Sequence, residues 1–176
     1  MSFQKDHVIL VNEKDEWLGT MEKIEAHRKG ALHRAFSVFV VNDKNEMLLQ
    51  QRAEEKYHSS GLWSNACCSH PFPGESTLAA AHRRLQEELG FDCPLTTAFH
   101  MRYCSAMNNG LTENEYDHIY TGLYNGTVSP DRKEVMNIKY VSLNALEKWV
   151  SEEPETFTSW FRMALPQVIG IFKNKQ

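Results

Sequence analysis

The sequence predicts an α+β fold, in which helices cover a mixed β-sheet as an α/β/α sandwich. Three observations predict it. Strand-like runs lie on both sides of the clearest helical pattern, and helical patterning returns near the end of the chain. The 176 residues, 41% of them hydrophobic, also suffice for one buried core. No linker-like or low-complexity stretch interrupts them, so we expect a single domain over residues 1–176.

The first half of the chain contains short apolar runs bounded by polar turns. Residues 8–12 form one such run and predict a strand. Residues 35–41 and 47–51 flank the polar turn at 42–45 and predict a hairpin.

The best-defined helix covers residues 76–89. Ser76 or Thr77 can cap its first turn, and Gly90 can end it in the left-handed region. Its expected apolar side consists of Leu78, Ala81, Leu85 and Leu89.

Three more strand-like runs follow this helix, at 96–105, 116–124 and 137–141. Helical patterning returns at 143–150 and at 158–172, where we expect Pro166 to kink or divide the last helix.

The charge and cysteine content exclude several classes of protein. Lys plus Arg total 19 against 23 Asp plus Glu, and this formal charge of −4 disfavours a nucleic-acid binder. The run at 8–11 is too short and its surroundings too charged for a signal peptide or a membrane span. Four cysteines, two of them adjacent, do not form a disulfide framework, so we expect reduced thiols and a cytoplasmic protein. The sequence gives no sign of an obligatory protein partner.

Residues 75–91 match the Nudix box. The matching positions are Glu75, Arg83, Leu85, Glu87, Glu88, Gly90 and Phe91. Ser69 stands where the box opens with glycine, and Arg84 stands where the hydrolase pattern has a glutamate. Replacing a metal-binding carboxylate by a cation suits a site that holds a diphosphate without cleaving it. These charged residues also have an ordinary explanation. Arg83 with Glu87, and Arg84 with Glu88, can form ion pairs four residues apart on a solvated helix face, each stabilising the helix by about 0.2–0.5 kcal/mol.

Other segments, in the same order and at similar spacing, extend the match over nearly the whole chain. They are residues 23–27, 32–36, 63–65, 68–71, 113–115 and 157–160. Together with the box, they resemble type I isopentenyl diphosphate isomerases of the Nudix superfamily. The resemblance implies a Nudix-type α/β/α sandwich and an enzyme of isoprenoid biosynthesis. Such an enzyme interconverts isopentenyl diphosphate and dimethylallyl diphosphate by protonation and deprotonation through a tertiary carbocation.

The resemblance also implies the catalytic groups. Cys68 and Glu115 occupy the positions of the family's catalytic cysteine and glutamate, and Tyr103 that of a tyrosine thought to assist the glutamate. Cys67, Cys93 and Cys104 have no such counterpart, and we expect them to pack in the core.

The implied metal site has five ligands. Glu113 and Glu115 are two residues apart, so on an extended segment both carboxylates project to one face. The resemblance adds three imidazoles, which completes the set His27, His33, His70, Glu113 and Glu115. This donor set suits Zn²⁺, Mn²⁺ or a similar ion such as Mg²⁺. Glu88, with the Cys68 carbonyl, would hold a second Mg²⁺ that bridges the substrate diphosphate.

The resemblance also implies a substrate pocket. Its candidate diphosphate-binding cations are Lys23, Arg52, Lys56 and Arg84. Trp160 matches a tryptophan at the hydrophobic end of the family's site, where it can stabilise the carbocation. Five histidines match nothing in the family pattern and are left outside the expected site: His7, His58, His82, His100 and His118.

Two other functions compete with this hypothesis. A Nudix hydrolase of nucleoside diphosphate derivatives explains the box alone, but leaves Cys68 and the three histidines without a role. A noncatalytic metal-stabilised binding module explains the ligands, but not the cations and acid/base residues.

Overall fold

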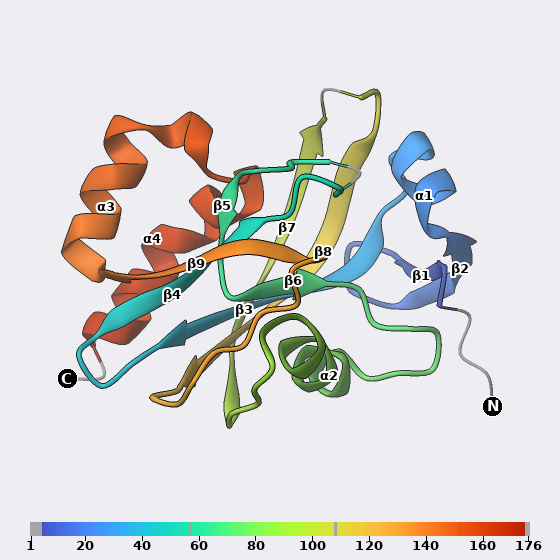
Figure 1. The fold of residues 1–176 in the computed structure, drawn as a ribbon. Coiled ribbons are helices and arrows are strands. Elements are labelled where there is room, and N and C mark those ends of the chain that lie inside the picture. Colours follow the sequence, from blue (N-terminus) through green and yellow to red (C-terminus); the bar gives the residue numbers. More distant parts are fainter. Residues whose placement is uncertain (1–4, 57, 108, 175–176) are drawn as a thin grey trace.

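A curved mixed β-sheet carries helices on both faces in the computed structural model (Figure 1). The structure describes residues 5–56, 58–107 and 109–174, so the ends of the expected 1–176 domain lie outside it. The strands are β1 (His7–Val11), β2 (Trp17–Glu22), β3 (His33–Val41), β4 (Glu46–Arg52), β5 (Trp63–Ser64), β6 (Cys67–Ser69), β7 (Leu95–Ala106), β8 (Thr112–Leu123) and β9 (Val135–Ser142). The helices are α1 (Lys23–Lys29), α2 (Thr77–Leu89), α3 (Leu143–Glu152), the 3₁₀ turn η1 (Pro154–Thr156) and α4 (Ser159–Lys173).

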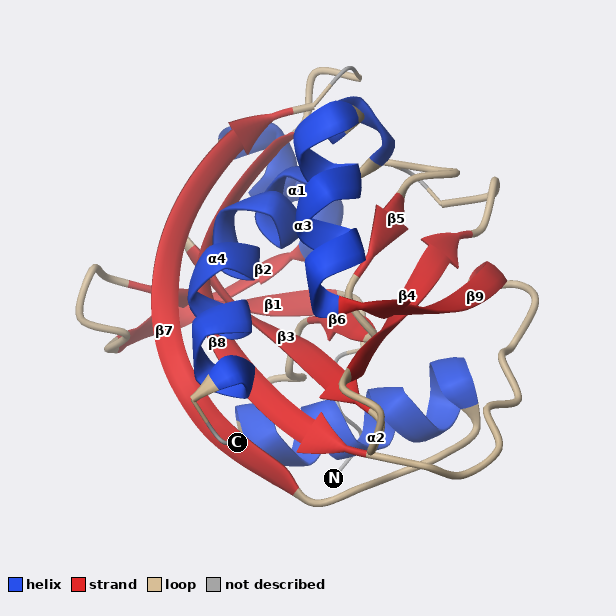
Figure 2. Ribbon diagram, turned by 90° about the vertical axis from the view of Figure 1, so that its left-hand side faces the viewer, coloured by secondary structure: helices blue, strands red, loops and turns tan. Residues whose placement is uncertain are grey.

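The central strand β3 separates two apolar cores. Phe36, Val38 and Val40 pack with the apolar side of α2, whereas Phe39 and Val41 pack with α4. This alternation is the period of two expected of a strand covered on both faces. In Figure 2 the long strands β7 and β8 curve around α4. The predicted α/β/α sandwich is therefore correct.

The sheet divides next to β3, and this division makes room for a site. β3 and β4 pair at Val41 and Met47, as the expected hairpin requires, and then take different partners. β3 continues parallel to β8 and antiparallel to the short β6. β4 pairs with β9 and with β5.

Helix α2 begins and ends as its sequence predicts. The Ser76 hydroxyl accepts a hydrogen bond from the Ala79 amide, and Gly90 has φ of 71°. One residue of the expected apolar side is wrong: Leu78 is 40% exposed, and Ala80 is buried in its place. At 100° per residue, Leu78 shares the side of Leu85 and Leu89, so its exposure does not come from the periodicity. Leu78 is the second residue of α2, and it is exposed at the end of the helix.

Helix α4 continues through Pro166, so the expected division does not occur. Its apolar side chains before and after the proline belong to one core, and their burial offsets the hydrogen bond that proline cannot donate. β2 and α1 were not predicted, nor were the short strands β5 and β6. None of the described helices is long and apolar enough to cross a membrane.

The cysteines correct one expectation. Cys67 and Cys93 are buried, as predicted, but Cys104 is exposed on β7. It alternates with the buried Tyr103 and therefore lies on the opposite face of the strand.

Candidate active site

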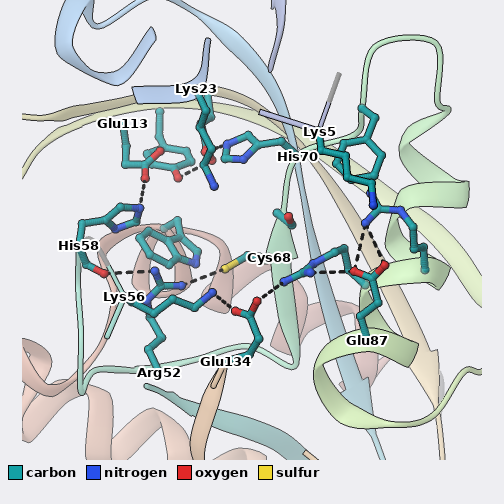
Figure 3. Close-up of a pocket in the computed structure, with 17 residues that line it drawn as sticks. Lys5, Lys23, Arg52, Lys56, His58, Cys68, His70, Glu87, Glu113 and Glu134 are labelled. Carbon is teal, nitrogen blue, oxygen red and sulfur yellow. Dashed lines mark hydrogen bonds and ion pairs between the residues drawn. The ribbon is translucent and has the colours of Figure 1, made fainter. Parts of the chain in front are cut away.

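A cavity of about 410 Å³ opens beside the division of the sheet (Figure 3). This volume is within the range of small-molecule sites. Ten of the thirteen residues that the sequence predicts for the site line it: Lys23, Arg52, Lys56, Cys68, His70, Arg84, Tyr103, Glu113, Glu115 and Trp160. The other three are not among the lining residues. His27 and His33 belong to the group of expected metal ligands, and Arg84 covers Glu88.

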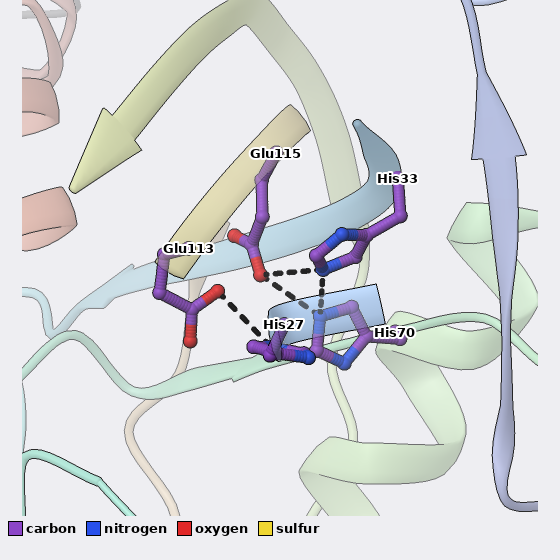
Figure 4. A group of neighbouring side chains, drawn as sticks. All are labelled: His27, His33, His70, Glu113 and Glu115. Carbon is purple, nitrogen blue, oxygen red and sulfur yellow. Dashed lines mark hydrogen bonds and ion pairs between the residues drawn. The ribbon is translucent and has the colours of Figure 1, made fainter. Parts of the chain in front are cut away.

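The five expected metal ligands converge at one side of this cavity (Figure 4). One potential ligand atom from each lies within 4.8 Å of the others. The parallel register of β3 and β8 sets His33 beside Glu115, and Glu113, two residues earlier on β8, lies on the same face of the strand. His27 comes from α1, and His70 from the residue after β6. Segments distant in sequence therefore supply a set of three imidazoles and two carboxylates.

Backbone carbonyls orient two of these imidazoles. Nδ1 of His27 lies 2.6 Å from the Lys23 carbonyl, and Nδ1 of His33 lies 2.8 Å from that of Ala31. Because a carbonyl oxygen only accepts, each neutral ring carries its proton on Nδ1 and directs the Nε2 lone pair into the group. This pattern of ring nitrogens and carbonyl partners is typical of histidines that bind a metal. The residues thus fit a divalent cation.

The histidine nitrogens approach one another closely, which also fits a shared ion. Nε2 of His33 lies 3.2 Å from Nε2 of His70, which in turn lies 2.8 Å from Oε1 of Glu115. Burial raises the pKa of Glu115, but the hydrogen bonds that the carboxylate accepts, including the one from Tyr103, outweigh burial and lower the pKa. The carboxylate is therefore ionised near neutral pH.

Tyr103 holds the other oxygen of Glu115. The two residues are register partners on the antiparallel strands β7 and β8, and the phenol donates a 2.5 Å hydrogen bond to Oε2. Burial and the nearby carboxylates raise the pKa of Tyr103 well above its usual value, so the phenol remains a donor.

Cys68 points away from its neighbour, as alternation on an extended segment predicts. The Cys67 side chain packs with the α2 core, whereas Cys68 packs at the edge of the α4 core and lines the cavity. Burial raises the pKa of Cys68 to about 12, although the positive charge of Arg52 acts to lower this pKa. Nη1 of Arg52 lies 3.9 Å from the sulfur. The group is thus a thiol at neutral pH, with a proton to donate.

The expected diphosphate-binding cations come from four different elements. Arg52 ends β4, and its guanidinium lies 5.4 Å from the centre of the Trp160 ring. Lys56 and Arg84 both contact Glu134, with Arg84 Nη2 at 3.2 Å from its carboxylate. Lys23 is half-buried, and its desolvation lowers its pKa. These groups share one cavity although their positions in the sequence are dispersed.

Glu88 is more buried than its expected place on the polar side of the helix suggests. It is 2% exposed, and Arg84 Nη2 contacts its Oε1 at 2.6 Å. The Gln50 amide donates to its other oxygen at 3.1 Å. The helix pairs expected from spacing therefore form, and one of them covers a carboxylate of the box.

The sequence analysis did not assign every lining residue to the site, and those that it missed include Glu134 and His58. Glu134 joins Lys56 to Arg84, and His58 contacts Glu113 at 2.7 Å. Glu134 is an isolated acid before a strand, and His58 lies in a polar loop, so neither has a periodicity or a spacing that reveals it.

The fold and the site define a NUDIX-domain protein with a group of imidazoles and carboxylates beside its cavity that could hold a metal ion. The NUDIX domain model matches residues 31–161. A Deinococcus radiodurans protein of known structure superposes with a TM-score of 0.70 at 17% identity, over 83% of this chain and 89% of its own. The MutT protein of Methanosarcina mazei gives 0.65 at 20% identity, over 82% and 94%. At these identities the structures establish the fold alone.

Sequence relatives narrow the family further. An isopentenyl-diphosphate Delta-isomerase of Pectobacterium atrosepticum is 48% identical over 172 residues, which cover 96% of both chains. One of Burkholderia multivorans is 46% identical over 157 residues, or 89% of both chains. The chain belongs to the isopentenyl-diphosphate Delta-isomerase family of NUDIX-domain proteins.

Proposed function

We propose that this protein interconverts isopentenyl diphosphate and dimethylallyl diphosphate in isoprenoid biosynthesis. The observation that carries the proposal is the presence of Cys68 and Glu115 on one cavity, together with four cationic side chains. The names of the curated relatives support the same reaction. An acid and a base that can reach one small diphosphate are what a double-bond shift requires.

The four cations, Lys23, Arg52, Lys56 and Arg84, would bind the diphosphate. Glu134 orders two of them before the substrate arrives, because it contacts both Lys56 and Arg84. Glu88 and the Cys68 carbonyl would hold Mg²⁺, whose positive charge would offset that of the diphosphate, once Arg84 releases Oε1 of Glu88. The released guanidinium would be available to a phosphate oxygen.

Cys68 and Glu115 would carry the proton transfers. An unactivated alkene is a weak base, so its protonation needs a positioned acid, and a base must remove a different proton from the tertiary carbocation. One of these two residues donates and the other accepts. Tyr103 would keep Glu115 oriented through the hydrogen bond to Oε2.

The five-ligand group would hold a divalent cation, with Zn²⁺, Mn²⁺ and Mg²⁺ as candidates. When bound, the ion would supply positive charge that favours the ionised form of the Glu115 carboxylate. His27 and His33, which are fixed by backbone carbonyls, would hold that side of the cavity rigid.

Trp160 would shelter the carbocation from water. It is 3% exposed and packs in the α4 core while it lines the cavity. The face of an indole attracts a desolvated cation by about 2 kcal/mol or more. Because the mechanism uses a free thiol at Cys68, we place the protein in the cytoplasm, where thiols remain reduced.

The experiment is to incubate the protein with isopentenyl diphosphate and Mg²⁺ in D₂O and to follow the products by NMR. We expect dimethylallyl diphosphate that contains deuterium from the solvent. Release of inorganic phosphate without an isomer would instead indicate a hydrolase, and no change of the substrate would favour a binding module.

Variants then test the two residues. Cys68→Ala and Glu115→Gln should each abolish turnover while circular dichroism remains that of the wild type. Cys104→Ala is the matched control, because the Cys104 thiol is exposed on the face of β7 opposite to Tyr103, which lines the cavity. A wild-type rate in either site variant would remove that residue from the mechanism.

A further inference from the structure

His58 lies outside the site that the sequence predicts, in the loop between β4 and β5. Its side chain is nevertheless only 6% exposed, and it lines the cavity. Three residues of the proposed site surround it: Glu113, Arg52 and Trp160. A buried polar ring in a loop requires partners, and here its partners belong to the site.

His58 contacts one of the two carboxylate oxygens of Glu113, and His27 lies near the other. Nε2 of His58 lies 2.7 Å from Oε1 of Glu113, and since a carboxylate only accepts, the ring donates this hydrogen bond. The other oxygen, Oε2, lies 3.3 Å from Nε2 of His27. Within the described part of the chain, Oε2 accepts no hydrogen bond. His58 therefore occupies one oxygen and leaves the other directed at the metal-ligating group.

Two further contacts of His58 reach the substrate side. Its backbone carbonyl accepts a 3.1 Å hydrogen bond from Nη2 of Arg52. Its ring meets Trp160 edge-on, with the ring centres 5.9 Å apart. One loop residue thus contacts a proposed metal ligand, a proposed diphosphate ligand and the aromatic wall.

We infer that His58 is a positioning residue, which orients Glu113 for the metal and joins the metal site to the Arg52 side of the cavity. The inference rests on the metal site of the proposed function. Residues that hydrogen-bond to metal ligands act in this way elsewhere, and their loss weakens metal affinity by about 10- to 100-fold.

Two substitutions separate the hydrogen bond from the packing. His58→Gln keeps an N–H donor at a similar reach, whereas His58→Leu keeps the bulk and removes the donor. His118→Leu is the matched control, because His118 is also partly buried and paired with a carboxylate, Asp15, but does not line the cavity. His58→Asn provides a shorter donor that should not reach Glu113.

The measurement is the affinity of the substrate-free protein for Zn²⁺ or Mn²⁺, by competition with a chromophoric chelator. His58→Leu and His58→Asn should bind the metal about 10- to 100-fold more weakly, with His58→Gln within about threefold of the wild type and His118→Leu unchanged. Wild-type affinity in His58→Asn, or equal losses in His58→Gln and His58→Asn, would overturn the inference. The Gln and Asn pair decides the question even if the leucine variant fails to fold.

This readout is independent of turnover. If the inference fails, the isomerase reaction can still be present in the D₂O assay. If the protein proves not to be an isomerase, the effect of His58 on metal affinity is still measured.

Discussion

The Tyr103 hydroxyl donates a 2.5 Å hydrogen bond to Oε2 of Glu115, while Oε1 of the same carboxylate faces His70 at 2.8 Å. The two oxygens of the proposed catalytic glutamate therefore have different partners: a phenol at Oε2, and imidazoles at Oε1. A carboxylate held from both sides cannot rotate freely, so its position relative to a substrate is set before binding.

Removing this phenol should lower turnover. Hydrogen bonds to charged groups contribute about 1.5–3 kcal/mol, so we expect Tyr103→Phe to reduce kcat by about 10- to 100-fold. Tyr120→Phe is the control, because that hydroxyl donates to Thr77 in the other core. Equal rates for the two variants would show that Tyr103 has no role in the reaction.

Removal of the divalent metal should abolish isomerisation and leave most of the fold. None of the five ligands belongs to either of the two apolar cores on the faces of β3. We expect dialysis against a chelator to eliminate turnover, to preserve the circular dichroism and to lower Tm, because a bound ion stabilises the folded state by mass action. Added Zn²⁺ or Mn²⁺ should restore the rate. Global unfolding of the stripped protein would instead favour the metal-stabilised binding module.

Gly90 should be intolerant of a side chain. It has φ of 71°, and a Cβ built there would lie 2.7 Å from the Ser129 carbonyl oxygen. Gly110 has φ of 77°, but no atom of the described residues lies within 4 Å of such a Cβ. Gly110→Ala should therefore cost only the left-handed strain, about 1 kcal/mol, and Gly90→Ala distinctly more. Urea unfolding at neutral pH measures both, and equal losses would show that the contact with Ser129 relaxes freely.

The pairing of Glu75 with Arg83 should make stability depend on pH. Both carboxylate oxygens accept from the guanidinium at 2.8 Å, and the Phe72 amide donates as well. Burial raises the pKa of Glu75, but these bonds outweigh it and lower the pKa below 4.5. A lowered folded pKa means that the stabilisation is complete above the unfolded value and is lost as the pH falls through the folded one.

Glu75→Gln should therefore reduce the free energy of unfolding more at pH 7 than at pH 3. Chemical denaturation of both proteins at the two pH values measures the difference. A loss that is the same at both pH values would show that the ionised form of Glu75 is not what stabilises the fold.

Periodic segments explain why much of the fold was predictable. The helix at 77–89, with its serine cap and terminal glycine, and the long strands all have local patterns that the tertiary structure keeps. The errors occur where packing decides. Leu78 is exposed in the first turn of its helix, Cys104 is on the outer face of its strand, and Pro166 is held within a helix by the core around it.

The sequence by itself determined which chemical groups are available, because motif positions identify the thiol, the carboxylates and the imidazoles. Only the tertiary structure decided how they meet. The β3–β8 register sets His33 beside Glu115, and the division of the sheet opens the cavity between them and Arg84. His58 and Glu134 joined the site for the same reason: contacts across a fold depend on three-dimensional packing, and no spacing along the chain encodes them.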